Sequence, residues 1–150
     1  MSFFDAINVS ASGMSAERLR MDVTSENLAN AQTTRSANGG PYRRKEVVLQ
    51  QASGDGGFGD VLTASIGGVT ASAAPKGVEV AGIVADPTPS QMIYDPGHPD
   101  ANAQGYVAMP NVNSVTEMVD LISEQRSYEA NVTAMQSSKT LFTKTFDLLR

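Results

Sequence analysis

"SVTEMVDLISEQRSYEANVTAMQSSKTLFTKTFDLLR", residues Ser114 to Arg150, is the most regularly patterned part of this chain. Its apolar positions recur in alternating steps of three and four, the spacing that lines up one face of a long helix. Eight of the ten positions in this series are apolar: Met118, Leu121, Gln125, Tyr128, Val132, Met135, Lys139, Phe142, Phe146 and Leu149. Ser114 and Glu117 form a capping-box pattern after Pro110, so we expect one helix from Ser114 to Leu149.

The charges of this segment are ordered as a helix dipole favours. Acidic side chains occupy its early half, at Glu117, Asp120, Glu124 and Glu129. The late half carries the basic side chains of Lys139, Lys144 and Arg150, and Asp147 departs from this order. We interpret the acidic residues as dipole partners. We expect the apolar face of this helix to be buried, either against the other helix of the chain or against another copy of the chain.

A second helical pattern covers the N-terminus. Its register alternates by four and three residues over about seven turns. The apolar positions are Phe4, Ile7, Ala11, Met14, Met21 and Leu28, and Arg18 and Ser25 interrupt the same register. Gly13 costs about 1 kcal/mol relative to Ala in a helix interior, so a partner must hold the helix there or the helix bends. Asn30 is expected to end the helix in the left-handed conformation.

The region between the two patterns contains most of the glycine and proline. Short β-type runs bounded by Gly, Pro or Asp predict strands at 46–50, 61–66, 77–84 and 91–94. Residues 54–77 read as a flexible loop or a pair of marginal strands. The expected fold class is mainly α, with two long terminal helices packed as an antiparallel coiled-coil-like pair and a small β-rich inserted region.

Composition narrows the function. Of the 150 residues, 41% are hydrophobic and 6% aromatic, and Trp is absent, so the core should be thin. The net charge of −5 argues against electrostatic binding of nucleic acid or anionic lipid. The basic run Arg43–Lys45 is too short to change that conclusion. Cysteine is absent, which excludes disulfides and thiolate metal sites. The N-terminus lacks a secretory signal pattern, so export would need another route.

Three motifs resemble cofactor or metal sites. Gly54, Gly56 and Gly59 spell GxGxxG, but the following segment is too short for the crossover helix of a dinucleotide-binding unit. The run Asp100–Gly105 imitates the start of a calcium loop, yet its twelfth position is Asn111 instead of Glu. Asp95, His98 and Asp100 favour a turn stabilised by Asp side chains over a metal site. We predict no catalytic, cofactor-binding or metal residue, and no enzyme.

Three segments resemble a known family: Ala11–Thr34, with the block "NLAN"; Pro41–Gln50, "PYRRKEVVLQ"; and Tyr94–Leu149, with "PNVN…EM…R.YEAN". They are similar to the rod proteins of the bacterial flagellum, in the rod and hook family. The resemblance covers both helical ends and leaves Ser53–Lys76 out. It implies a structural subunit of the proximal rod, the periplasmic drive shaft of the basal body, exported without a cleaved signal peptide and assembled into a helical tube.

The resemblance also implies partners. These are copies of the same chain, the rod proteins FlgB, FlgF and FlgG, the rod-base adaptor FliE and the flagellar export apparatus. It implies no cofactor, no nucleic acid and no direct membrane insertion. The expected domains are residues 1–34, the N-terminal helix of an inner helical domain; residues 35–110, a β-rich extended region with a Gly-rich insert at about 53–77; and residues 111–150, the C-terminal helix of the inner domain.

The predicted subunit-interface residues fall into two groups. The first group comes from the recurring apolar positions of the two expected helices, which we call the seams. These residues are Phe4, Ile7, Met14, Met21, Leu28, Leu121, Tyr128, Val132, Met135, Phe142 and Phe146. The polar positions that match the family's motifs give Asn27, Asn30, Asn111, Asn113 and Asn131, together with Tyr128. Two alternatives remain open: a self-contained coiled-coil interaction or adaptor module, and an amphipathic membrane-surface helix led by Phe3 and Phe4, which the acidic face weakens.

Overall fold

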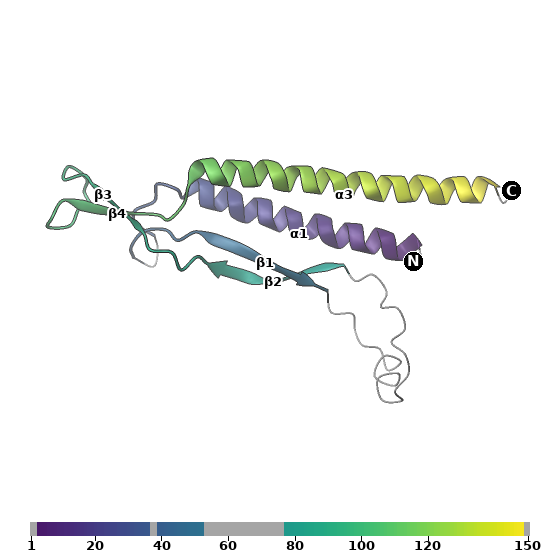
Figure 1. Cartoon of the computed structure of the whole chain (residues 1–150), viewed down its shortest axis with the longest axis horizontal. Helices are drawn as coiled ribbons and strands as arrows, with labels where there is room; N and C mark the ends of the chain where they lie inside the picture. The colour runs from purple at the N-terminus through teal and green to yellow at the C-terminus, as the bar shows by residue number, and fades with distance from the viewer. Residues whose placement is uncertain (1–2, 37–38, 53–76, 149–150) are drawn as a thin grey trace, which may run out of the picture. The chain divides into compact units, whose positions relative to one another are not determined.

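The computed structural model describes residues 3–36, 39–52 and 77–148 (Figure 1). Two long helices lie at the ends of the chain and short strands between them, so the fold is mainly α with a small β region. In chain order the elements are α1 (Phe3–Ala29), β1 (Lys45–Gln51), β2 (Val78–Ala85), β3 (Gln91–Tyr94), β4 (Tyr106–Met109) and α3 (Ser114–Leu148). Among the helices described, none is long and apolar enough to cross a membrane.

The chain divides into two compact units. The first unit comprises Met1–Glu17, Leu49–Ala81 and Arg126–Arg150, and the second comprises Arg18–Val48 and Gly82–Gln125. Both long helices and the β1–β2 pair therefore contribute residues to each unit. We describe each unit by itself.

Helix α3 confirms the predicted helix, which begins at Ser114 and continues to Leu148. The predicted capping box at its start is wrong, because Asn113 is the cap. The Asn113 side-chain oxygen accepts hydrogen bonds from the backbone N–H groups of Val115 and Thr116, at 3.0 and 3.3 Å. Asn is a preferred N-cap residue, which leaves the Glu117 carboxylate available for another role.

Helix α1 also matches its prediction in extent, and Gly13 lies inside a continuous helix. The prediction that Asn30 ends it in the left-handed conformation is wrong, since no described residue other than glycine has a positive φ. Instead, the Asn30 side chain donates to the backbone oxygen of Glu26 at 2.9 Å. The same Glu26 oxygen also accepts from the backbone N–H of Asn30 at 3.1 Å, so Asn30 holds the last turn of the helix through both its backbone and its side chain.

The strands form two separate two-stranded sheets, β1 with β2 and β3 with β4. The β3–β4 pair is antiparallel, in a register that runs from Gln91 opposite Met109 to Tyr94 opposite Tyr106. The strands predicted at 46–50, 77–84 and 91–94 are confirmed by β1, β2 and β3, whereas β4 was not predicted. The predicted strand at 61–66, the GxGxxG motif and most of the Gly-rich insert lie outside the described residues.

The described core is thin, as the composition predicts. Its buried apolar side chains are Ala16, Val23, Tyr42, Val107 and Val112. Four polar side chains are buried as completely: Thr24, Asn27, Glu117 and Glu124. Except for Ala16, all of these residues belong to the second unit. The second unit is therefore built around polar contacts as much as around apolar ones.

Candidate subunit interface

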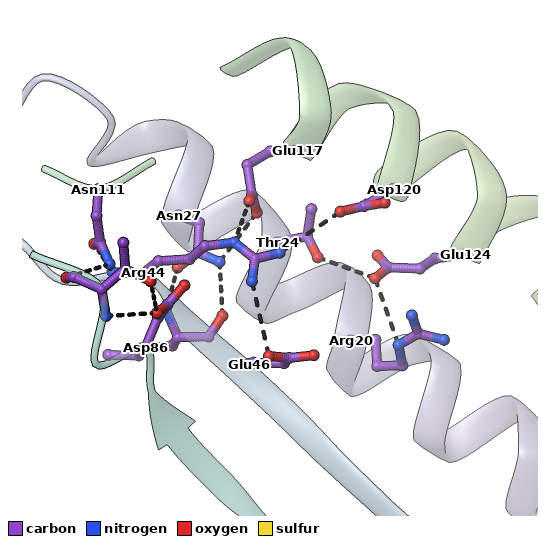
Figure 2. Close-up of polar contacts among 12 residues, drawn as sticks. Arg20, Thr24, Asn27, Arg44, Glu46, Asp86, Asn111, Glu117, Asp120 and Glu124 are labelled. Atoms are coloured by element: carbon purple, nitrogen blue, oxygen red, sulfur yellow. Dashed lines mark hydrogen bonds and ion pairs between the residues drawn. The ribbon is translucent and has the colours of Figure 1, made fainter. Parts of the chain in front are cut away.

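Asn27, in the "NLAN" block of α1, is the centre of the polar contacts in the second unit (Figure 2). Its side chain is 1% exposed. The amide nitrogen donates to the backbone oxygen of Lys45 at 2.8 Å and to the Glu117 carboxylate at 3.0 Å. The amide oxygen accepts from the Tyr42 hydroxyl and from the backbone N–H of Lys45, both at 2.9 Å. All four hydrogen bonds that an Asn side chain can make are therefore used.

Arg44, at the start of β1, binds the carboxylates of α3. Its Nε donates to Glu117 at 2.6 Å, and its terminal nitrogens lie 3.6 Å from Asp120 and 3.8 Å from Glu46. The hydrogen bond to Glu117 is the main reason that the pKa of Arg44 is raised above its usual value. A buried carboxylate is stable only when it is paired and hydrogen-bonded, and Arg44 with Asn27 meets both needs of Glu117.

Tyr42 binds the amide oxygen of Asn27 through its hydroxyl. Its ring is 8% exposed, and the Lys45 ammonium lies 5.7 Å from the ring centre. Burial, followed by the negative charges of Glu26 and Glu117, raises the pKa of Tyr42 to about 12. The phenol consequently remains neutral at physiological pH, as it must to donate its proton to Asn27.

A second buried carboxylate, Glu124, lies one heptad after Glu117 on the same face of α3. It accepts a hydrogen bond from the Thr24 hydroxyl at 3.1 Å and lies 3.6 Å from the guanidinium of Arg20. Both partners come from α1 (Figure 2). Thr24 and Arg20 approach Glu124, while Asn27, further along α1, approaches the earlier Glu117, so the two helix segments of this unit run antiparallel.

Asn111 connects the segment before α3 to β1. Its side-chain oxygen accepts from the backbone N–H of Arg44 at 2.9 Å, and its amide donates to the backbone oxygen of Thr88 at 3.2 Å. The backbone N–H of Asp86 donates to the carbonyl of Arg44 at 2.8 Å. Hydrogen bonds from the hydroxyl and then the backbone N–H of Thr88 lower the pKa of Asp86. The backbone on both sides of the Arg44 side chain is thereby fixed.

In the first unit, glycine residues allow neighbouring segments of the chain to pack closely. A Cβ atom at Gly13 would lie 2.9 Å from the side-chain nitrogen of Asn131, so glycine allows α1 and α3 to approach here. A Cβ atom at Gly77 would collide with the hydroxyl of Ser12, which also accepts from the backbone N–H of Val78 at 3.1 Å. Gly13 therefore has a packing role, and α1 stays continuous there.

Helix α3 exposes apolar side chains on the face away from its buried carboxylates. Val115, Met118, Val119 and Ile122 are 70%, 52%, 61% and 52% exposed, and all four lie in the first turns of α3. At about 100° per residue they share one side of the helix, roughly opposite Glu117. We call this surface the α3 outer stripe. Contiguous exposed apolar side chains are a feature of protein–protein interaction sites.

The predicted seam residues are mostly half-buried. Ile7, Met14, Met21, Leu28, Leu121, Tyr128, Val132, Met135 and Phe142 have this intermediate exposure, and Phe4 is 65% exposed. The side chain of Phe146 lies outside the described residues. The buried residues of α1 are Ala16, Val23, Thr24 and Asn27. Ala16 lies about 200° around the helix from Met14, and Val23 lies about 200° from Met21. The role of the seam residues as subunit contacts remains a prediction.

The predicted motif residues have three different environments. Asn27 is buried, Asn113 is exposed at the start of α3, and Asn30, Asn111 and Asn131 are half-buried. Sequence reasoning missed Arg44 and Tyr42 and assigned Glu117 and Glu124 to the helix dipole. Their spacing of seven residues, which places both on one face of the helix next to the apolar positions Leu121 and Tyr128, is the signal that they point inward.

The loop between β3 and β4 forms turns, as predicted. Asp95 accepts from the backbone N–H of Gly97 at 3.1 Å, and Asn102 accepts from those of Gln104 and Tyr106, both at 2.9 Å. Asp100 accepts from the Thr34 hydroxyl at 2.8 Å. In the part of the chain that the structure describes, no cluster of three or more His, Asp or Glu residues is arranged to hold a metal ion.

Two protein families match the helical ends of the chain. The family described as "Flagella basal body rod protein" matches residues 7–35, which include most of α1. The family described as "Flagellar basal body rod FlgEFG protein C-terminal" matches residues 103–148, which include β4 and α3. These are the two regions that contribute Asn27 and Glu117 to the buried polar contacts.

Curated relatives match along the whole chain. "Flagellar basal-body rod protein FlgC" of Bacillus subtilis (strain 168) is 48% identical over 152 residues, covering 99% of both chains. The protein of the same name from Borreliella burgdorferi is 43% identical, covering 100% of this chain and 99% of its own length. That of Escherichia coli O6:H1 is 36% identical, covering 99% and 98%. Such relatives are structural rod proteins and not enzymes. The chain belongs to the FlgC family of flagellar basal-body rod proteins.

Proposed function

We propose that this rod protein is a subunit of the proximal rod that assembles through its terminal helices into a helical tube. The domains follow from that role. Residues 1–34 and 111–150 form an inner helical domain, where α1 and α3 pair as a coiled coil, and residues 35–110 form a β-rich extended region.

The observation that carries this proposal is the α3 outer stripe. One face of α3 in the second unit is covered, through Glu117 and Glu124, by α1 and the start of β1. The opposite face presents four large apolar side chains to solvent. An isolated chain gains nothing from exposing them, whereas a subunit in a repeating assembly buries them in every copy.

The partners and the location are part of the same proposal. The chain contacts copies of itself, FlgB, FlgF and FlgG, and the adaptor FliE joins it to the rod base. It reaches the periplasm through the flagellar export apparatus without a cleaved signal peptide. Relatives named as basal-body rod proteins, matched over nearly their whole length, support this reading.

The experiment is complementation of a strain that lacks this chain's gene, with rod incorporation and swimming as the readouts. Val119→Asp places a carboxylate in the α3 outer stripe. Because Val119 is exposed in the single chain, the variant should remain soluble and helical. In an assembly the charge would be buried without a partner, at a cost of several kcal/mol for each copy, so incorporation and swimming should be lost.

Ser15→Asp is the matched control, since Ser15 is exposed on α1 and its hydroxyl donates to the backbone oxygen of Ser12 in the same helix at 2.8 Å. This variant should swim normally. The alternative, a self-contained adaptor module, predicts normal rods with both variants. Full motility of the Val119→Asp strain would therefore contradict assembly through α3.

A further inference from the structure

A cationic groove lies in the second unit, beside the buried polar contacts. Its volume is about 710 Å³, and its walls come from the end of α1, the loop that follows it, the start of β1 and the end of β2. The charged side chains that line it are Glu26, Arg35, Arg43 and Lys45. We call it the Arg35–Arg43 groove. Its size falls within the range of surface sites that hold ligands or peptide segments.

Two of these charges neutralise each other. The Lys45 ammonium donates to the Glu26 carboxylate at 2.6 Å. Arg35 and Arg43 are both exposed, and within the described residues neither makes an ion pair or a side-chain hydrogen bond. The groove therefore presents two arginine head groups whose donors are not used by the residues that the structure describes.

The walls of the groove are held in place without a ligand. The backbone N–H of Tyr42 donates to the carbonyl of Thr33 at 3.0 Å, and that of Ser36 donates to the carbonyl of Gly40 at 2.8 Å. The Thr33 hydroxyl donates to Asn30 at 3.1 Å, which ties the loop to the end of α1. Tyr42 forms a floor that is fixed by Asn27. A site that is ordered beforehand loses less entropy on binding.

The charge of the chain identifies the occupant. The chain as a whole carries −5, yet this groove carries a local positive charge. Arginine guanidinium groups bind carboxylates in a two-pronged geometry. Resting on the proposed rod function, we propose that the Arg35–Arg43 groove receives a segment of a neighbouring rod subunit that carries at least two carboxylates. In a copy of this chain, which carries a net charge of −5, such segments are available, and the contact would set the orientation of neighbouring subunits, because electrostatic complementarity fixes register more than it adds affinity.

The first test needs no rod. The isotope-labelled full chain is titrated with an acetylated hexaglutamate peptide, and backbone amide shifts are followed by NMR. Shifts should concentrate in residues 33–36 and 39–45 and weaken as salt is added. Arg35→Glu with Arg43→Glu should weaken binding at least tenfold, a loss of about 1.4 kcal/mol. Arg35→Lys with Arg43→Lys, which keeps the charges, should retain binding.

Arg18→Glu with Lys144→Glu is the matched control. Both residues are exposed on helices, and the double variant has the same net charge as the groove variant. Equal weakening in the two double variants, or shifts spread over the whole surface, would overturn the proposal. Competition for the groove by phosphatidylglycerol vesicles would assign it to a membrane and would also overturn the proposal.

The second test uses the complemented strain. The Arg35→Glu, Arg43→Glu chain should be exported but should fail to form rods, while the Lys variant should restore swimming. Normal swimming with the Glu variant would overturn the groove proposal and leave the rod function intact. If a strain without the chain swims, the rod function itself fails, and the peptide titration still reports on the groove.

Discussion

The two units of this chain stabilise the same two helices by different means. In the second unit, α1 and α3 meet through Asn27, Glu117 and Glu124, which are buried and hydrogen-bonded. In the first unit, Ala16 is the one fully buried side chain among the described residues, and the apolar positions of α3 stay half-buried. One part of each helix is therefore held within the chain by buried polar contacts, while the part in the first unit has few buried contacts of its own.

The largest effect is expected from removal of the central carboxylate of the second unit. Glu117→Ala leaves the Arg44 guanidinium and the Asn27 amide without their partner. Breaking a buried pair from one side costs about 3 kcal/mol or more. The free energy of unfolding, measured by urea titration with far-UV circular dichroism, should fall by that amount.

Glu46→Ala is the control for Glu117→Ala. Glu46 also lies near Arg44, but at 3.8 Å and with a side chain that is 69% exposed. Such surface pairs contribute at most about 1 kcal/mol. If the two variants unfold at the same urea concentration, the polar contacts do not secure the second unit, and the comparison between the units fails.

A smaller effect is expected at Tyr42. Tyr42→Phe removes one of the two hydrogen bonds to the Asn27 oxygen and should cost about 1 kcal/mol at pH 7. The pKa of Tyr42 in the folded chain is about 12, above the ordinary value of 10.0, so folding favours the neutral phenol. This stabilisation is complete below pH 10 and is lost as the pH rises towards 12.

The stability of the parent chain should therefore fall more steeply than that of Tyr42→Phe between pH 10 and about 12. The measurement is the urea midpoint of both proteins across this range. Parallel curves would mean that the buried phenol does not contribute to the stability of the second unit.

The sequence predicts the elements of this fold better than their partners. Alternating apolar positions predict α1 and α3 to within a residue or two, because helix periodicity is a local property. Strand β4 was missed because YVAM is short and gains its strand conformation from pairing with β3. The pairing of two strands that are distant in the sequence cannot be predicted from the local pattern of either strand.

The buried polar contacts could be predicted only in part. The "NLAN" block identifies Asn27, but its four hydrogen bonds join it to three residues, Tyr42, Lys45 and Glu117, in two distant segments of the chain. Glu117 suits both a capping box and a helix dipole, and only its proximity to Arg44 distinguishes these roles from an inward one. The choice between them depends on Asn113, which caps the helix and so releases Glu117.

Amide hydrogen exchange of the purified full-length chain measures how firmly each part of the two helices is held. We expect the amides of 18–29 and 114–125, which belong to the second unit, to exchange at least roughly 100-fold more slowly than those of 5–17 and 126–146 in the first. In assembled rods the slow exchange should extend over both helices. Equal protection along the whole of α1 and α3 in the dilute monomer would contradict the account, because the helices would then need no neighbours.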